Sequence, residues 1–214
     1  MTSSAHVAIS KVRCAHMCST AERCNSFFYN RISKLCLLEW MVYVSPGGAV
    51  TSSGWRYFRL HSASCPKEDG YVIDTVSSTC YRVVTSPANF LDARAACNSK
   101  QDSLVVLDLV DKARFMTDFV NHNLDTLGAQ TYYIGLSRPV GLWNTPFPAS
   151  GPDYVWETGQ TVNLTATQEF WGPNKPANSD NKDNVIRLST SIGYKWDDTQ
   201  EYHLRGYVCE RPFV

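Results

Sequence analysis

The sequence predicts an α+β protein made of two disulfide-stabilised domains. The eight cysteines fall into two groups of four, one group before Cys65 and one from Cys65 onward. Short runs of aromatic and β-branched residues alternate with segments of helical spacing, as in mixed folds. A chain of 214 residues has room for one large domain or two small ones. We expect one domain over residues 1–62 and another over 63–214, with a very short linker at 61–64.

The first domain is predicted from its cysteines and aromatic residues. Cys14 and Cys18 are spaced by four, which places both side chains on one face of a helical turn. The aromatic run after Cys24 and the apolar run around Cys36 indicate two short strands. Two bridges would then attach the helix to the hairpin. A module of this size buries little apolar surface, so such bridges are the expected source of its stability.

This pattern, with the closing segment 54–60, resembles the PAN/apple module over about residues 5–60. The resemblance implies the pairs Cys14–Cys36 and Cys18–Cys24. The third bridge found in some members of that family is absent here.

The second domain is predicted to contain two helices and several strands. Asn89 is followed by Asp92 in the manner of a capping box, and a helix with Cys97 on it follows. A second helix is expected after Asp108, with a core face at spacing four. The other expected elements are a hairpin at 65–80, strands at 132–136 and 154–158, and a loop rich in Pro and Gly at 143–152.

The order of these elements resembles the C-type lectin-like fold, which has two helices, antiparallel sheets and a long loop. The matching pieces are Cys65 and Cys80, the Ala-rich helix with Cys97, Tyr-Ile-Gly-Leu at 133–136, Trp-Glu-Thr-Gly at 156–159, Trp171, and Tyr-Val-Cys-Glu at 207–210. The resemblance implies the pairs Cys65–Cys80 and Cys97–Cys209. The inner bridge usual in the family is absent, because Val185 and Glu201 stand at its two ends.

Sugar-binding members of that family hold calcium with a Glu-Pro-Asn triplet, an acid six residues further on, and a Trp-Asn-Asp triplet. The spacing is kept here as Lys175-Pro-Ala, Asp183 and Trp196-Asp-Asp. By this resemblance the expected ligand-binding residues are Lys175, Asn178, Asp183, Asn184, Asp197 and Asp198.

Two basic residues argue against tight calcium binding at these positions. Lys175 replaces an acid of the triplet, and Arg138 stands where the auxiliary calcium site of the family usually has an acid. A unit charge pair at 4 Å is worth roughly 4 kcal/mol at an effective dielectric of 20, so a Lys beside a divalent ion costs about twice that. We therefore expect no metal or other cofactor. We expect Lys175 to pair with Asp183 and Asp198 instead. If calcium does bind to this degraded site, its ligands should be Asp183, Asp197 and Asp198.

Composition and cysteine use indicate the compartment and exclude some partners. Lys plus Arg (20) equals Asp plus Glu (20), so no basic field attracts nucleic acid or an anionic membrane. No apolar run is long enough for a membrane span. The cysteines form no CxxC pair and no Cys–His set with the spacing of a zinc site, which favours disulfides over zinc and indicates a secreted, extracellular protein. The sequon at Asn163 predicts N-glycosylation. Residues 1–6 lack the features of a signal peptide, so we interpret the chain as the mature, soluble part.

An enzymatic function is not expected. The five histidines are scattered, and no nucleophile motif, metal-spaced cluster or Gly-rich phosphate loop is present. The sequence therefore predicts a secreted, non-catalytic protein that recognises a glycan or glycoprotein with little calcium dependence. The alternative is an extracellular matrix or protein-interaction protein, in which the lectin-like domain binds no sugar and supports protein contacts or self-association.

Overall fold

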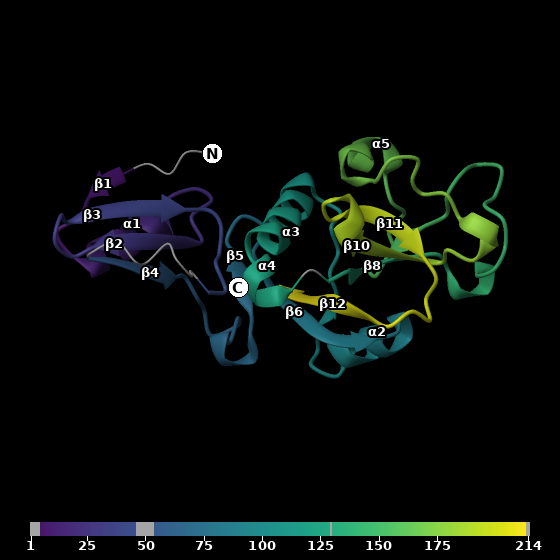
Figure 1. Ribbon diagram of the computed structural model, residues 1–214, viewed down its shortest axis with the longest axis horizontal. Coiled ribbons are helices and arrows are strands. Elements are labelled where there is room, and N and C mark those ends of the chain that lie inside the picture. The colour runs from purple at the N-terminus through teal and green to yellow at the C-terminus, as the bar shows by residue number, and fades with distance from the viewer. Residues whose placement is uncertain (1–4, 46–53, 129, 213–214) are drawn as a thin grey trace. The chain divides into compact units, whose positions relative to one another are not determined.

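The computed structural model describes residues 5–45, 54–128 and 130–212 (Figure 1). By its internal contacts the chain divides into two compact units, Met1–Cys80 with Pro212–Val214, and Tyr81–Arg211. The hairpin that ends at Cys80 thus belongs to the first unit. The domain boundary at residue 62 stays a prediction about where the two modules begin and end.

The first unit is a four-stranded sheet with one helix. The helix α1 (Lys11–Thr20) begins at Ser10, whose side chain accepts a hydrogen bond from the backbone N–H of Arg13. The sheet has the order β1-β3-β2-β4, and neighbouring strands run antiparallel. Its strands are β1 (Ala5–Val7), β2 (Ser26–Asn30), β3 (Leu35–Glu39) and β4 (Trp55–Arg59).

Two disulfides attach α1 to this sheet, as the PAN-like spacing predicts. Cys14 bonds to Cys36 on β3, and Cys18 bonds to Cys24 just before β2. All four cysteines are buried and, with Phe27 and other residues, form the core of the unit.

The hairpin 65–80 is tied to the sheet by a buried asparagine. It contains the 3-10 helix η2 (Lys67–Asp69), β5 (Val72–Asp74) and the start of β6 (Thr79–Ala88), and is closed by the Cys65–Cys80 bridge. The Oδ1 of Asn25 accepts hydrogen bonds from the backbone N and Oγ1 of Thr75, at 2.8 and 2.7 Å. Because Asn25 is fully buried, these bonds replace water that it has lost.

The second unit has the two predicted helices. In α2 (Phe90–Asn98), Asn89 caps the helix by accepting from the N–H of Asp92, and its own amide donates to the Asp92 carboxylate at 2.7 Å. The carboxylate of Asp92 thus accepts a hydrogen bond from the side chain of the capping residue rather than from its backbone. In α3 (Val110–His122) the residues at spacing four are buried as predicted, and the short α4 (Leu124–Leu127) follows.

The remaining strands form one mixed sheet, with both antiparallel and parallel pairs. Its strand order is β11-β10-β8-β12-β6-β5, with β7 (Ser103–Leu104) on β12 and β9 (Val155–Trp156) on β8. The strands first named here are β8 (Tyr132–Ser137), β10 (Val185–Ser189), β11 (Lys195–Thr199) and β12 (Arg205–Pro212). A Cβ on Gly135 of β8 would lie 2.6 Å from the carbonyl oxygen of Leu104, so only glycine fits there.

The fourth disulfide, Cys97–Cys209, joins α2 to β12 across 112 residues. A bridge that closes a loop of this length contributes roughly 4–5 kcal/mol in the chain-entropy model. All four predicted pairings are therefore confirmed.

The long loop between β8 and β10 rests on a cluster of aromatic residues. The rings of Trp156, Phe170 and Trp171 each lie 5.5 Å from that of Trp196, measured between centroids. All four side chains are buried, so the three tryptophans belong to the core. The loop also contains α5 (Leu164–Thr167), η4 (Gln168–Phe170) and η5 (Ser179–Asn181).

Candidate functional site: a lysine between two buried aspartates

Lys175 occupies the centre of the long-loop site. Its Nζ lies 2.8 Å from Oδ1 of Asp197 and 3.1 Å from Oδ1 of Asp198. Burial opposes the charge, but hydrogen bonds and Coulombic attraction to the two aspartates outweigh it and raise the pKa of Lys175 above its ordinary value. The ammonium group therefore stays charged at neutral pH. The Lys175–Pro176 peptide bond is cis.

Asp198 connects the loop to strand β11. Its side chain is fully buried, and its Oδ2 accepts hydrogen bonds from the backbone N–H groups of Ala177 and Asn178. With Lys175 on the other oxygen, both oxygens of this carboxylate have partners inside the protein. Asp198 therefore holds the backbone of the segment 175–178 in place.

Asp197 lies between two cations. Its Oδ1 faces Lys175, and its Oδ2 accepts from Nε and Nη2 of Arg187, the former at 2.9 Å. Arg187 stands directly opposite Asp197 in the β10–β11 pair. Arg187 was not predicted as a site residue, although two strands paired in register around residues 190–194 would place it opposite Asp197.

Asp183 does not pair with Lys175, and this part of the prediction is wrong. Its Oδ2 instead accepts from the backbone N–H of Ser179 at 2.7 Å, because the η5 turn brings that N–H to it. Burial and the nearby carboxylate of Asp198 raise the pKa of Asp183. The predicted pairing of Lys175 with Asp198 is confirmed.

The two predicted asparagines also bond within the loop. Asn178 accepts from the backbone N–H of Asp183 at 3.3 Å and donates to the Thr145 carbonyl at 3.2 Å. Asn184 donates to Oε2 of Glu201 at 2.9 Å and accepts from the N–H of Asn144 at 3.1 Å. The Asn184–Glu201 hydrogen bond connects the two segments that the missing inner disulfide would have joined at Val185 and Glu201.

Arg138 is a second buried cation. Its guanidinium is fully buried and donates to both oxygens of Asp153, at 2.6 and 3.0 Å, and to the Thr145 carbonyl at 2.6 Å. A planar guanidinium suits such two-pronged pairing. Asp153 was not predicted from the sequence, since it lies in a loop with no motif around it.

The residues present do not fit a calcium ion. Calcium requires six to eight oxygen ligands, whereas the carboxylates of Asp183, Asp197 and Asp198 already accept from ammonium, guanidinium or backbone N–H groups. Over residues 5–45, 54–128 and 130–212, no group of three or more His, Cys, Asp or Glu is arranged to hold a metal. The ammonium group of Lys175 supplies positive charge to Asp197 and Asp198 instead.

The six predicted residues lie in one region but differ in accessibility. Asn178, Asp183, Asn184, Asp197 and Asp198 are buried. The side chain of Lys175 is 25% exposed and borders a shallow pocket of about 580 Å³. Its lining consists of Leu164, Thr165, Gln168, Trp171, Gly172, Pro173, Asn174, Lys175 and Pro176.

Asn163, the predicted glycosylation site, lies beside this pocket at the start of α5. It is exposed, and its Oδ1 caps the helix by accepting from the N–H of Ala166 at 3.0 Å. A glycan is attached through the other amide atom, the nitrogen, so the cap and the modification are compatible. Glycosylation itself stays a prediction.

Comparison with known proteins decides the family. The family model of the lectin C-type domain matches residues 86–211, more than half of the chain. The chain belongs to the C-type lectin domain family. The model of the PAN domain matches residues 2–65, so a PAN domain precedes the C-type lectin domain. C-type lectin BML-2 of Bungarus multicinctus is 24% identical over 138 residues, which are 61% of this chain and 75% of that protein.

Solved structures of C-type lectin domains share the fold. The carbohydrate-recognition domain of cow CD23 matches with a TM-score of 0.52 and 21% identity, over 70% of this chain and 97% of that chain. Human lithostathine matches with a TM-score of 0.54 and 21% identity, over 73% and 97%. A calcium-independent type II antifreeze protein matches with a TM-score of 0.52 and 19% identity, over 72% and 98%. At these identities the likeness concerns the fold alone.

Proposed function

We propose that the protein is a secreted, non-catalytic lectin whose C-type lectin domain binds a glycan or glycoprotein without calcium. The domain is of a carbohydrate-binding type, and the cow CD23 domain was solved in the presence of an oligosaccharide. Four formed disulfides support an oxidising, extracellular location. No helix in the described part of the chain is long and apolar enough to cross a membrane.

Calcium independence rests on one observation, the position of Lys175 between Asp197 and Asp198. A divalent cation at the same carboxylates would be repelled by the ammonium and would have to displace it. Solved relatives include both a calcium-dependent and a calcium-independent type II antifreeze protein, so the fold itself is compatible with either state.

The pocket beside Lys175 is the proposed sugar contact. Thr165, Gln168 and Asn174 line it, and their side chains are exposed. A hydroxyl and two amides both donate and accept hydrogen bonds, as sugar hydroxyls require. The buried aspartates and asparagines would then position the loop, while Lys175 and these three residues contact the ligand.

A glycan array tests this proposal, read with the full chain in calcium and again in EDTA. Equal signals for the same glycans in both conditions are expected. The variants Gln168→Ala and Asn174→Ala should then lower binding, whereas Gln101→Ala, a change at an exposed position outside the pocket, should not. Enzymatically deglycosylated protein controls for a glycan at Asn163. Signals that vanish in EDTA would contradict calcium independence.

A second function is favoured by the internal bonding of the loop. The side-chain oxygens of Asp198, Asp183 and Asn178, at or beside the positions where sugar-binding relatives hold ligands, are bonded within the protein. This arrangement also suits a scaffold for protein contacts or self-association, as in a matrix protein. An array without any signal, together with concentration-dependent mass in sedimentation, would favour this second function.

A further inference from the structure

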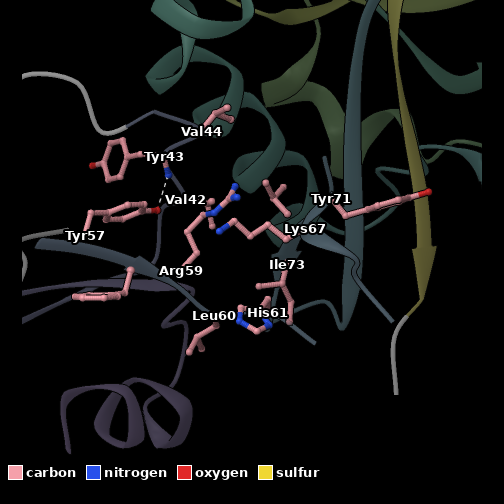
Figure 2. A pocket seen from close by; sticks show the side chains of 12 residues that line it. Val42, Tyr43, Val44, Tyr57, Arg59, Leu60, His61, Lys67, Tyr71 and Ile73 are labelled. Carbon is pink, nitrogen blue, oxygen red and sulfur yellow. Dashed lines mark hydrogen bonds between the residues drawn. The ribbon is translucent and has the colours of Figure 1, made fainter. Parts of the chain in front are cut away.

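The first unit contains a pocket that is separate from the site around Lys175. It has a volume of about 390 Å³ and lies between strand β4, the segment 42–44 and the hairpin that follows η2 (Figure 2). Every residue of its lining belongs to the first unit. The lining consists of Val42, Tyr43, Val44, Tyr57, Phe58, Arg59, Leu60, His61, Lys67, Tyr71, Val72 and Ile73.

Basic side chains line this pocket, and the described part of the lining contains no carboxylate. In the view of Figure 2 the guanidinium of Arg59 and the ammonium of Lys67 extend toward one another, and the ring of His61 lies below them. Among the described residues, no aspartate or glutamate belongs to the lining. Within the described ranges, neither the guanidinium of Arg59 nor the ammonium of Lys67 forms a hydrogen bond or ion pair. Two like charges that share a pocket favour an anion between them.

Apolar and aromatic side chains form the rest of the wall. Val42, Val72 and Ile73 are buried residues of the lining. The hydroxyl of Tyr57 accepts a hydrogen bond from the backbone N–H of Tyr43 at 2.7 Å, and their rings meet edge to face at 5.7 Å. This bond holds the ring of Tyr57 in place. Tyr57 and Arg59 lie on the same face of β4, because alternate residues of a strand share a face.

The chemistry of the lining selects one class of ligand. The described lining side chains include no carboxylate or amide that would accept hydrogen bonds from the many hydroxyls of a neutral sugar. They supply cationic donors at one place and apolar surface elsewhere. A volume of about 390 Å³ lies within the range of small-molecule sites.

We propose that this pocket binds a small organic acid, a carboxylate or sulfate carried on an aromatic or aliphatic body. The acid group lies between Arg59 and Lys67, and the body packs against Tyr57, Val72 and Ile73. The site is independent of the function proposed for the lectin loop.

Calorimetry with the full chain tests the assignment. The probe is 4-methylphenyl sulfate, compared with 4-methylphenol, which lacks the anion, and with sodium sulfate, which lacks the apolar body. The aryl sulfate should bind more tightly than either, because it uses both parts of the pocket. Arg59→Gln and Lys67→Gln should each weaken its binding by about fivefold or more, since each removes a charge-assisted contact.

Matched controls separate the pocket from general charge. Arg56→Gln changes an exposed arginine on the same strand, and Lys34→Gln an exposed lysine in the same unit. Both should leave the affinity within about twofold of the parent, as expected for screened surface charges. Near-UV circular dichroism checks that every variant keeps the parent fold. Sodium sulfate or 4-methylphenol binding as tightly as the aryl sulfate, or an unchanged affinity in the Arg59→Gln/Lys67→Gln double variant, would overturn the proposal.

Discussion

The Nζ of Lys175 lies 3.1 Å from Oδ1 of Asp198, a carboxylate with no exposed surface. The other oxygen of Asp198 accepts from the backbone of Ala177 and Asn178. The chain thus supplies its own cation to Asp197 and Asp198, the carboxylates that the motif spacing predicts as ligand-binding residues. The lysine also belongs to the segment that it helps to fold, so charge neutralisation and loop geometry depend on the same side chain.

Restoring the family's ligand triplet should create calcium affinity. In Lys175→Glu with Ala177→Asn, an ammonium is replaced by a carboxylate and an amide oxygen is added. Calcium favours sites rich in carboxylate oxygens. We expect the double variant to bind calcium and to gain thermal stability from it, measured by calorimetry and by the melting temperature with and without calcium.

Lys182→Glu is the control for that experiment. It makes the same charge change at an exposed position of the same loop. This variant should show no calcium-dependent rise in melting temperature. Equal rises in both variants would mean that added negative charge, rather than the position of residue 175, is responsible.

Removing the lysine charge alone should destabilise the lectin domain. Lys175→Met leaves Asp198 buried without its cation, whereas Asp197 keeps Arg187. Lys175 is partly buried, so we expect a loss of about 1–3 kcal/mol, between the values for exposed and buried pairs. Urea unfolding with intact disulfides measures this loss. Lys182→Met, at an exposed position, should stay within about 0.5 kcal/mol of the parent.

Arg138 and Arg114 offer a comparison of buried and exposed ion pairs. Arg138 is fully buried against Asp153, whereas Arg114 and Glu169 are each more than half exposed. Arg138→Lys keeps the charge but loses the planar guanidinium that donates to both oxygens of Asp153. This change should lower the free energy of unfolding by about 2–4 kcal/mol, because buried donors and acceptors lose partners. Arg114→Lys should cost less than about 0.5 kcal/mol. Similar losses in urea unfolding would refute the assigned role of Arg138.

Asp183 should contribute a pH dependence of its own. Burial, with repulsion from Asp198, raises its pKa in the folded state. Between the ordinary and the raised pKa, the folded protein binds a proton that the unfolded chain has released, so this residue lowers stability as pH rises through that window. Asp183→Asn keeps an oxygen for the Ser179 N–H and removes the charge. Its stability relative to the parent should rise from about pH 4 toward neutral.

Unfolding curves over that pH range measure the effect. Asp180→Asn, the same substitution at an exposed position of the same loop, controls for the change in net charge. A difference between Asp183→Asn and the parent that does not change with pH would contradict the raised pKa.

The fold was predictable because its signals are local or rigidly spaced. Cys14 and Cys18 at spacing four, and the Asn89 cap, follow from helical geometry and are found in the structure. The attachment of the hairpin 65–80 to the first unit was not predicted. It depends on the contact between Asn25 and Thr75, fifty residues apart, for which no sequence pattern exists.

The site was predicted in position but only partly in connectivity. Motif spacing located Lys175 and Asp198, and opposite charge predicted their pairing. The roles of Arg187 and Asp183 depend on strand register and on a 3-10 turn, which decide which neighbour each side chain reaches. The pocket of the first unit that contains Arg59 and Lys67 was not predicted either, because these two residues come from separate elements.

Calorimetric titration of the parent protein with calcium, after dialysis against EDTA, tests the central claim most directly. If Lys175 neutralises Asp197 and Asp198, no calcium binding should be detected at micromolar concentrations, the range of sensor sites with full oxygen ligation. Micromolar binding that is lost in the Asp197→Asn/Asp198→Asn double variant would contradict the claim and would make this domain a calcium-dependent lectin.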